Sequence, residues 1–278
     1  MTDSSLLASE PAVLFFDVDG TLIWSDKEQL KEGRNPREVL PNASVYDAFE
    51  RLHERGHLTF LCTGRPLSFV SEGLLSLGFT GVVSGAGACV TIGDDIAYEA
   101  VIPQDILCET IEQFIAFDVT VLLESRQTPV MLNPSGAPVS AFSDIPVAAD
   151  LAGVKRLAPD MRFCKFSVMP EEDWDVPALR EFLDQHFVSC DMGLTYELSM
   201  IGVDKGAGVR RALSLLGHSV ENTYAFGDSE NDLPMFPEVE IPIAMGNAMA
   251  CVKKQAAYIT GYANADGIAS ALRHFGLI

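Results

Sequence analysis

The stretch Asp17-Val18-Asp19-Gly20-Thr21 directly follows the apolar run Ala-Val-Leu-Phe-Phe at positions 12–16. A short continuous apolar run is typical of a strand that is buried on both faces, as in a parallel sheet. Ligands of such sheets bind beyond the carboxyl ends of the strands, where two carboxylates two residues apart can face one pocket. Gly20 permits a sharp turn, and a divalent cation would offset the repulsion between Asp17 and Asp19. The stretch predicts a cation site at a strand end, although a solvated Asp-Gly turn would also fit it.

Strand and helix patterns alternate on both sides of this stretch. The expected strands are 58–62, 81–84, 223–226 and 241–245, and the expected helices are 44–55, a helix starting at Pro66, 205–216 and 266–274. Strands that alternate with helices predict an α/β fold with right-handed crossovers. We therefore expect a doubly wound parallel sheet, built from residues 1–85 and 197–278.

The middle of the chain has a different pattern. Residues 88–92 and 96–101 flank Gly93-Asp94-Asp95 as in a hairpin, and helices are expected at 104–117 and 176–186. Further strands are expected at 119–123, 162–168 and 194–200, whereas residues 128–152 have no assignable pattern. Hairpins among helices predict an inserted α+β domain over residues 86–196. Glycines 81, 85, 87 and 202 would let it move as a lid joined near residues 84–88 and 201–202.

The composition limits the partners and the compartment. A net charge of −20 disfavours nucleic acid and anionic lipid as partners, so a phosphate site must supply its own positive charge. No apolar run is long enough for a membrane helix, and Met1–Glu10 resembles a short tail rather than a secretion signal. The six cysteines lack Cys-x-x-Cys spacing, which favours reduced thiols in a cytoplasmic protein.

Two further motifs indicate phosphate binding. Thr63-Gly64-Arg65 follows the strand 58–62 and offers a hydroxyl and free backbone N–H groups ahead of a helix. Gly202-Val203-Asp204-Lys205-Gly206 opens the helix 205–216 and places a lysine at its positive end, where a lysine is normally unfavourable. Each motif alone would also fit a plain turn or a solvated surface lysine.

The last motif is acidic. Gly227-Asp228-Ser229-Glu230-Asn231-Asp232 follows the strand 223–226 and holds three carboxylates and one amide. Oxygen-rich clusters of this kind suit a hard cation such as Mg²⁺, although a solvated acidic loop is the alternative. All four motifs are expected at one edge of the sheet.

The order and spacing of the four motifs resemble those of the haloacid dehalogenase-like (HAD) superfamily of phosphohydrolases. The chain is similar to the Cof-type branch, whose large cap is inserted between the second and third motifs. The stretches Ala244-Met245-Gly246-Asn247-Ala248 and Asn264-Ala265-Asp266-Gly267 also resemble this branch. The resemblance covers the chain beyond its N-terminal tail, and it implies a Rossmann-like core with a cap and a Mg²⁺-dependent phosphatase.

The resemblance also implies a role for each matched residue. Asp17 would attack phosphorus and form an aspartyl-phosphate, while Asp19 would protonate the leaving oxygen and then activate water. The metal ligands would be Asp17, Asp19 through its backbone carbonyl, and Asp228. The phosphoryl oxygens would be held by the Val18 backbone, Thr63, Gly64, Lys205 and Asn231, with Asp232 in a supporting position.

The residue at position 19 bears on the reaction. An acid there supplies the base that activates water, which favours a phosphatase over the similar ion-pumping ATPases that carry Thr. A phosphomutase or phosphotransferase, or a non-catalytic protein that binds a phosphorylated ligand, are the alternatives. Ser84-Gly85-Ala86, Tyr262 and Ala263 depart from the branch's usual residues near the pocket. The expected substrate is a small phosphorylated metabolite, with sugar phosphates ranked first, and the sequence predicts no oligomeric state.

Overall fold

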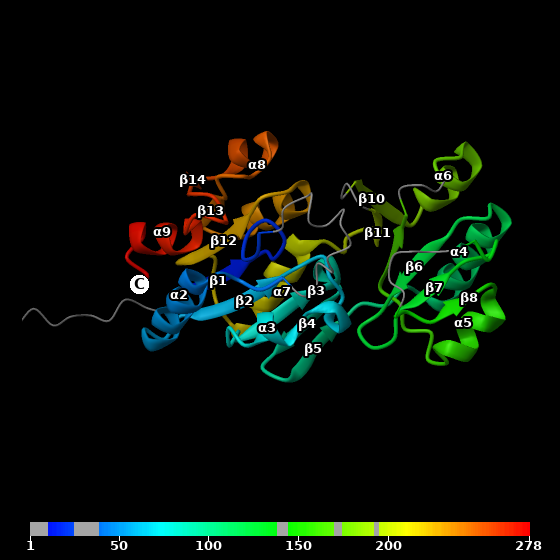
Figure 1. Cartoon of the computed structure of the whole chain (residues 1–278), viewed down its shortest axis with the longest axis horizontal. Helices are drawn as coiled ribbons and strands as arrows, with labels where there is room; N and C mark the ends of the chain where they lie inside the picture. Colours follow the sequence, from blue (N-terminus) through cyan, green and yellow to red (C-terminus); the bar gives the residue numbers. More distant parts are fainter. Residues whose placement is uncertain (1–10, 25–38, 138–143, 170–173, 192–194) are drawn as a thin grey trace, which may run out of the picture.

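The computed structural model describes residues 11–24, 39–137, 144–169, 174–191 and 195–278, so the tail expected at Met1–Glu10 lies outside the described residues. Two units lie side by side, each built around its own sheet (Figure 1). The larger unit holds both ends of the described chain, and the smaller unit is formed by the middle of the sequence.

Within the described residues, the larger sheet has eight strands, in the order β14-β13-β12-β1-β2-β3-β4-β5. Neighbouring strands from β14 to β3 pair in parallel, and β4 and β5 continue the sheet in antiparallel pairing. Their bounds are β14 (Tyr258–Ile259), β13 (Ile241–Ala244), β12 (Thr223–Gly227), β1 (Val13–Phe16), β2 (Leu58–Cys62), β3 (Gly81–Ser84), β4 (Cys89–Ile92) and β5 (Asp95–Glu99). The central strand β1 is fully buried, as its continuous apolar run predicts.

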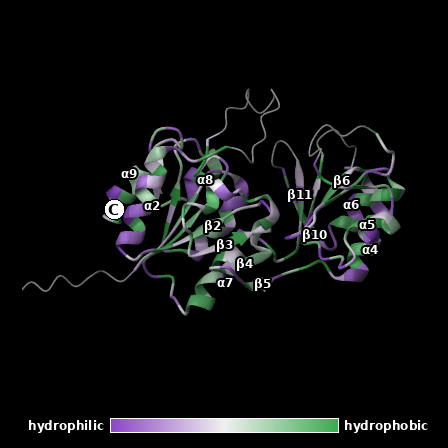
Figure 2. Ribbon diagram, turned by 60° about the horizontal axis from the view of Figure 1, so that its bottom comes forward, coloured by the Kyte–Doolittle hydropathy of each residue, from purple (hydrophilic) through white to green (hydrophobic). Residues whose placement is uncertain are grey.

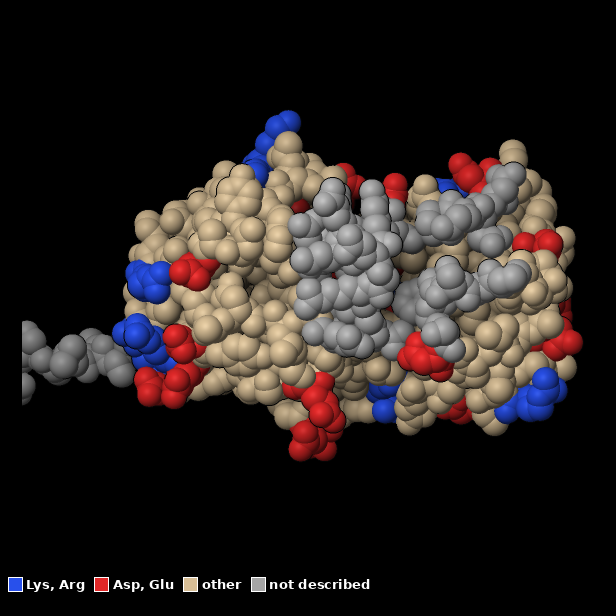
Figure 3. All heavy atoms as spheres, in the orientation of Figure 1, with Lys and Arg blue, Asp and Glu red and all other residues tan. Residues whose placement is uncertain are grey.

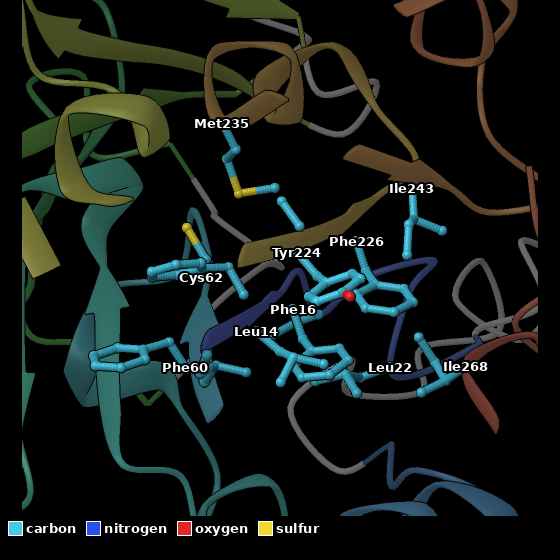
Figure 4. Packing of buried hydrophobic residues seen from close by; sticks show 14 of the residues in the cluster. Leu14, Phe16, Leu22, Phe60, Cys62, Tyr224, Phe226, Met235, Ile243 and Ile268 are labelled. Carbon is cyan, nitrogen blue, oxygen red and sulfur yellow. The ribbon is translucent and has the colours of Figure 1, made fainter. Parts of the chain in front are cut away.

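Helices cover both faces of this sheet, which confirms the doubly wound α/β prediction. On one face, the Phe16 ring lies 4.7 Å from Phe226 and 4.9 Å from Phe49 of α2 (Ala43–Glu54). Figure 4 shows Phe16 and Phe226 packed side by side in this core. On the other face, Val83 contacts Gly208 of α7 (Lys205–Leu216), where a Cβ would lie 2.3 Å from the valine side chain. Since Phe16 and Val83 occupy opposite faces of the sheet, α2 and α7 enclose it from both sides.

Local signals set the ends of these helices. The Asn42 side chain accepts a hydrogen bond from the Val45 amide at the start of α2, and Asp204 does the same for Ala207 at the start of α7. Gly217 ends α7 with a φ of 66°, a left-handed conformation that suits glycine. Helices α2 and α9 (Gly267–His274) contact each other and carry both hydrophobic and hydrophilic residues (Figure 2).

The single helix expected from Pro66 onward is wrong. The chain instead forms a short 3₁₀ segment, η2 (Leu67–Phe69), and a separate one-turn helix, α3 (Glu72–Leu75). Val70 between them has extended backbone, and the Ser71 side chain accepts a hydrogen bond from the Leu74 amide to start α3 afresh. The apolar spacing was compatible with one helix, but the serine cap divides it.

The smaller sheet has the order β10-β11-β9-β6-β7-β8 among the described residues, and every pair except β7–β8 is antiparallel. Its helices enclose a second core with Leu123, Phe166 and Leu198. This arrangement confirms an inserted α+β cap. The strands are β10 (Phe187–Asp191), β11 (Tyr196–Met200), β9 (Lys165–Val168), β6 (Val121–Glu124), β7 (Val130–Leu132) and β8 (Val147–Ala148), and the helices are α4 (Gln104–Ala116), α5 (Leu151–Leu157) and α6 (Pro177–Leu183).

The expected start of the cap at residue 86 needs correction. Strands β4 and β5 extend the larger sheet, because Val83 of β3 pairs with Val90 and the hairpin continues from there. Gly87 packs closely against the start of α7, since a Cβ there would lie 2.0 Å from the Asp204 carbonyl oxygen. We propose that the chain crosses between the units near residues 100–103 and 201–204, where Gly202 has a φ of 81°.

On the face shown in Figure 3, Asp and Glu side chains form several separate groups, with Lys and Arg between and beyond them. None of the helices in the described ranges is both long and apolar enough to cross a membrane. All six cysteines are free thiols.

Candidate active site

The four motifs meet at the carboxyl edge of the larger sheet. Asp17 follows β1, Thr63 follows β2, and Asp228 follows β12, while Lys205 is the first residue of α7. This is the edge at which ligands bind in open α/β sheets. The structure therefore brings together residues that are up to 215 positions apart in the chain, from Asp17 to Asp232.

The centre of the site is the buried ammonium group of Lys205. It donates hydrogen bonds to Asp17 Oδ1 at 2.5 Å and to Asp232 Oδ1 at 2.6 Å. Lys205 and Asp232 are fully buried, and Asp17 is nearly so. Because a buried charge is stable only when it is paired, the three side chains form one electrostatic unit.

Asp232 is held in place from its other side. Its Oδ2 accepts hydrogen bonds from the backbone N–H groups of Asp228 at 2.8 Å and Ser229 at 3.0 Å. The bond from Ser229 is one half of a capping box at the start of η4 (Glu230–Glu238), in which the Ser229 side chain accepts from the Asp232 backbone N–H in return. Asp232 thus uses one oxygen to shape the loop and the other to position Lys205.

Asp228 lies against the loop that follows β1. Its Oδ1 accepts a hydrogen bond from the Thr21 hydroxyl at 3.2 Å. Gly20 has a φ of 88°, and a Cβ at that position would lie 2.3 Å from Asp228 Oδ2. Position 20 therefore requires glycine for two reasons: its backbone has a positive φ, and a larger side chain would clash with the Asp228 carboxylate.

Burial and the repulsion between neighbouring carboxylates raise the pKa values of the aspartates Asp17 and Asp228. Burial, together with the Asp232 charge, raises the pKa of Asp17 well above its ordinary value, against the lowering effect of Lys205. The same two causes raise the pKa of Asp228 to about 7. Burial alone would lower the pKa of Lys205, but Asp17 and Asp232 raise it, so the lysine stays protonated.

The residues present fit a divalent cation. One carboxylate oxygen from each of Asp17, Asp228 and Asp232 lies within 4.8 Å of the other two. Three carboxylates face one ammonium group there, so the ionised cluster carries excess negative charge that a dication would neutralise. Oxygen ligands of this kind are those that Mg²⁺ prefers. Two of the expected metal ligands, Asp17 and Asp228, belong to this group. Its third carboxylate is that of Asp232, which was expected only in a supporting position.

The Asp19 side chain is exposed and paired with Arg65. It is 54% exposed, and the Arg65 guanidinium donates to both of its oxygens, from Nε at 2.9 Å and from Nη2 at 2.7 Å. A fork-to-fork pair of this type fixes the orientation of the carboxylate. Arg65 belongs to the motif Thr63-Gly64-Arg65, but the sequence did not predict that it pairs with Asp19.

The other expected phosphate-binding groups lie in the loops that follow β1, β2 and β12. The buried Thr63 hydroxyl accepts a hydrogen bond from the Arg65 amide at 3.1 Å. A Cβ on Gly64 would lie 3.6 Å from the Asn231 amide nitrogen, so these two residues adjoin. The Val18 carbonyl accepts hydrogen bonds from three successive amides, of residues 21, 22 and 23, which fixes the orientation of its peptide group.

Two residues beside the site were missed by the sequence reasoning. Asn247 donates to the Gly20 carbonyl at 2.7 Å and accepts from the Ala263 amide at 3.0 Å, so it ties the loop after β1 to the C-terminal loops. Glu197 of the smaller sheet reaches Gly64, where both of its carboxylate oxygens would lie 3.3 Å from a Cβ. Asn247 stood in a quoted motif, but no local pattern distinguishes Glu197.

Known proteins are similar to this chain over most of its length. The sequence model of the haloacid dehalogenase-like hydrolase family matches residues 14–272. The chain belongs to this family. Its fold and its relatives place it with the Cof-type phosphatases of the HAD superfamily.

Full-length relatives occur in Bacillus subtilis strain 168. The protein YkrA is 29% identical over 280 residues, which cover 96% of this chain and 98% of YkrA. The 5-amino-6-(5-phospho-D-ribitylamino)uracil phosphatase YitU is 25% identical over 282 residues, covering 97% of this HAD phosphatase and 99% of YitU.

Solved structures show the same fold over the whole length. A phosphatase from Bacteroides thetaiotaomicron, BT1666, superposes with a TM-score of 0.79 at 23% identity, covering 99% of this chain and all of that one. The HAD subclass IIB sugar phosphatase BT4131 superposes with a TM-score of 0.76 at 24% identity, covering 96% of this chain and all of that one. The core with its inserted cap is therefore the shared architecture.

Proposed function

We propose that this phosphatase hydrolyses a small phosphorylated metabolite, with sugar phosphates first, through an aspartyl-phosphate on Asp17 and with Mg²⁺ as cofactor. The observation that carries the proposal is the buried contact of Lys205 with both Asp17 and Asp232, directly beside Asp228. In this proposal, a carboxylate nucleophile, a buried positive charge and carboxylate oxygens suited to Mg²⁺ act together on one phosphoryl group. Phosphoryl transfer needs these groups because catalysis depends on positioning and charge neutralisation.

In the first half-reaction, a carboxylate oxygen of Asp17 attacks phosphorus. The new Asp17 O–P bond forms as the bond to the leaving oxygen breaks, and the Asp19 carboxyl gives its proton to that oxygen. Lys205 stabilises the negative charge of the equatorial oxygens, together with the Thr63 hydroxyl and the backbone of the loop at Gly64. Asp19 must leave Arg65 to reach the leaving group, because its two oxygens are now engaged by the guanidinium.

In the second half-reaction, the ionised Asp19 carboxylate takes a proton from water. The water oxygen attacks phosphorus, the Asp17 O–P bond breaks, and inorganic phosphate leaves while the Asp17 carboxylate is restored. Asp232 keeps Lys205 in place throughout, since it holds the ammonium at 2.6 Å and is itself fixed by two backbone amides.

Asp17, Asp228 and the Asp19 backbone carbonyl would hold Mg²⁺. When bound, Mg²⁺ supplies positive charge that favours the ionised form of Asp17 and neutralises the phosphoryl oxygens. The raised pKa of Asp17 and that of Asp228, about 7, support this assignment, because both carboxyls need a cation to be fully ionised near neutral pH.

Substrate size follows from the position of the smaller unit. Glu197 reaches the loop at Gly64, and the Ser68 hydroxyl donates to the Ser125 carbonyl at 3.0 Å, so the two units contact each other next to the site. A site covered in this way excludes large substrates. The net charge of −20 disfavours nucleic acids independently. We propose a cytoplasmic enzyme on the basis of its six free thiols.

A substrate panel tests the proposal. The rate of phosphate release with Mg²⁺ is compared across sugar phosphates, pyridoxal phosphate, mononucleotides and a phosphopeptide. We expect kcat/KM to be highest for a small organic phosphate, and isotope-labelled sugar phosphate should yield free phosphate rather than an isomer. A phosphopeptide that outperforms every small metabolite, or turnover to an isomer alone, would refute it.

A further inference from the structure

The loop of residues 245–249, which follows β13, supports the backbone of an expected metal ligand. Two of its N–H groups donate hydrogen bonds to the residues at the end of β12. The Met245 amide donates to the Gly227 carbonyl at 3.0 Å, and the Met249 amide donates to the Asp228 carbonyl at 2.8 Å. This loop, called the β13 loop below, therefore fixes Asp228 from outside the four motifs.

The β13 loop is itself held firmly by its surroundings. The Gly246 amide donates to the Gly261 carbonyl at 2.9 Å, and the Lys253 ammonium donates to the Gly246 carbonyl at 2.6 Å. A Cβ on Gly246 would lie 2.9 Å from the backbone nitrogen of Tyr262, so the two loops pack backbone to backbone. A side chain that projects from the β13 loop thus starts from a fixed position.

Asn247 is such a side chain, and both ends of its amide group are used. Its nitrogen donates to the Gly20 carbonyl at 2.7 Å, and its oxygen accepts from the Ala263 amide at 3.0 Å. One contact needs a donor and the other needs an acceptor, so only one orientation of the amide satisfies both. Asn247 therefore holds the Gly20 carbonyl in one direction.

Gly20 is a position where the backbone needs an outside contact to fix it. Its φ is 88°, and a glycine can change its dihedral angles at little steric cost. The Gly20 carbonyl shares a peptide group with the Thr21 N–H, which donates to the Val18 carbonyl at 3.2 Å. The Thr21 hydroxyl in turn donates to Asp228 Oδ1 at 3.2 Å. Rotation of this peptide group would displace Thr21 and remove its contact with Asp228.

We propose that Asn247 is a positioning residue for the Mg²⁺ site, and that it sets the affinity for the cation by fixing the turn at Gly20. The inference rests on the proposed function, in which Asp228 and the Asp19 carbonyl hold Mg²⁺. Both ligands adjoin this turn. The Asp19 carbonyl belongs to the peptide group before Gly20, and Asp228 contacts the hydroxyl of Thr21, which follows Gly20.

Mg²⁺ titration of Asn247→Ala by calorimetry, without substrate, tests the inference. Loss of a residue that orients metal ligands typically costs about 10–100-fold in affinity, so we expect Kd to rise at least about tenfold. The value of kcat at saturating Mg²⁺ should change much less. Asn133→Ala is the matched control, because Asn133 also donates to a carbonyl, that of Ala137 at 2.7 Å, and accepts from an amide, that of Gly136 at 3.1 Å. It lies in the smaller unit, so its loss should leave the Kd for Mg²⁺ unchanged.

A double-mutant cycle tests the route of the effect. Thr21→Val removes the hydroxyl that contacts Asp228 and keeps a side chain of similar size, so it should also raise the Kd for Mg²⁺. If Asn247 acts through Thr21, the losses of binding free energy in Asn247→Ala and Thr21→Val should not add in the double variant. Full additivity of the two losses would contradict this route.

The outcomes separate the inference from the proposed function. If wild type binds no Mg²⁺, the metal site of the proposed function fails. If wild type binds Mg²⁺ and a folded Asn247→Ala variant keeps the wild-type Kd, only the inference fails. An equal rise of Kd in Asn133→Ala would also overturn it, because the effect would then be a general loss of stability. Asn247→Ser, which keeps a polar side chain, provides the same measurement if Asn247→Ala does not fold.

Discussion

Lys205 Nζ lies 2.5 Å from Asp17 Oδ1 and 2.6 Å from Asp232 Oδ1, so one ammonium group joins the carboxylate after β1 to the carboxylate in η4. All three side chains are buried. Removing the lysine would leave two adjacent carboxylates without a counter-charge, whereas removing either carboxylate would leave the lysine one partner.

Lys205→Met should therefore destabilise the protein as well as inactivate it. Breaking a buried ion pair by removing one partner typically costs about 3–5 kcal/mol. The free energy of unfolding in urea, measured with EDTA present, gives this value. Lys254→Met, an exposed change on α8 (Ala250–Gln255), should stay within about 0.5 kcal/mol of wild type. Equal stabilities of the two variants would contradict the paired-cluster account.

Gly20→Ala and Gly56→Ala form a matched pair. Both glycines have positive φ, 88° and 77°, but a Cβ on Gly20 would clash with Asp228 while a Cβ on Gly56 would meet nothing within 4 Å. Gly56→Ala should cost about 1–2 kcal/mol for backbone strain alone. Gly20→Ala should cost at least about 1 kcal/mol more, and weaken Mg²⁺ binding, since Asp228 must move. Urea unfolding and Mg²⁺ titration measure both effects. Equal losses of unfolding free energy in the two variants would contradict the predicted clash with Asp228.

Metal removal should abolish turnover reversibly. EDTA should stop hydrolysis and Mg²⁺ should restore it, while Ca²⁺ should inhibit because it favours more ligands and looser geometry. Binding should also stabilise the fold by about 2.7 kcal/mol at a Mg²⁺ concentration of 100 times Kd. Thermal unfolding with and without Mg²⁺ measures this shift, and Asp228→Asn should lose most of it. Full activity after complete metal removal would rule out the metal site.

The acidity of Glu124 predicts a pH dependence of stability. Burial raises its pKa from an ordinary 4.5 to about 7, against the lowering effect of Lys165. Between these two pH values, the folded state thus keeps a proton on Glu124 that the unfolded state releases. The stabilisation of the folded state by this proton is complete below pH 4.5 and is lost as the pH rises to about 7.

Glu124→Gln removes this titration. Its stability relative to wild type should rise with pH between about 5 and 7, by up to about 1.4 kcal/mol per pH unit. Urea unfolding of both proteins across this range measures the difference. Glu112→Gln, at an exposed position, serves as the control. A stability difference that does not change with pH would contradict the raised pKa of Glu124.

Most of the core sheet was predictable from sequence because its strands are continuous apolar runs. Strands β1, β2, β3, β12 and β13 all appear within one or two residues of their expected bounds. The short strands β7 and β8 and the edge strand β10 were not predicted. Strand β10 has partly exposed residues and no clear alternation, so its pairing with β11 depends on tertiary context.

The site was predictable to a different extent. The four motifs singled out Asp17, Lys205, Asp228 and Asp232, which the structure brings together, because each stands near the end of a strand or the start of a helix. Contacts between motifs were not predictable, since the Asp19–Arg65 pair joins residues 46 positions apart across two strands. The ion pairs of Lys165 with Glu124 and Glu197 were missed for the same reason. These residues come from three strands, and only the pairing of β6, β9 and β11 brings them together.

The central claim is that Asp17 is the nucleophile, and Asp17→Asn tests it most directly. An amide cannot form the aspartyl-phosphate, so the variant should fold and lose at least about a thousandfold of kcat. Beryllofluoride, which mimics the acyl phosphate, should bind wild type and not the variant. Retention of substantial initial activity by Asp17→Asn, with mass spectrometry showing no conversion of the asparagine back to aspartate, would contradict the account.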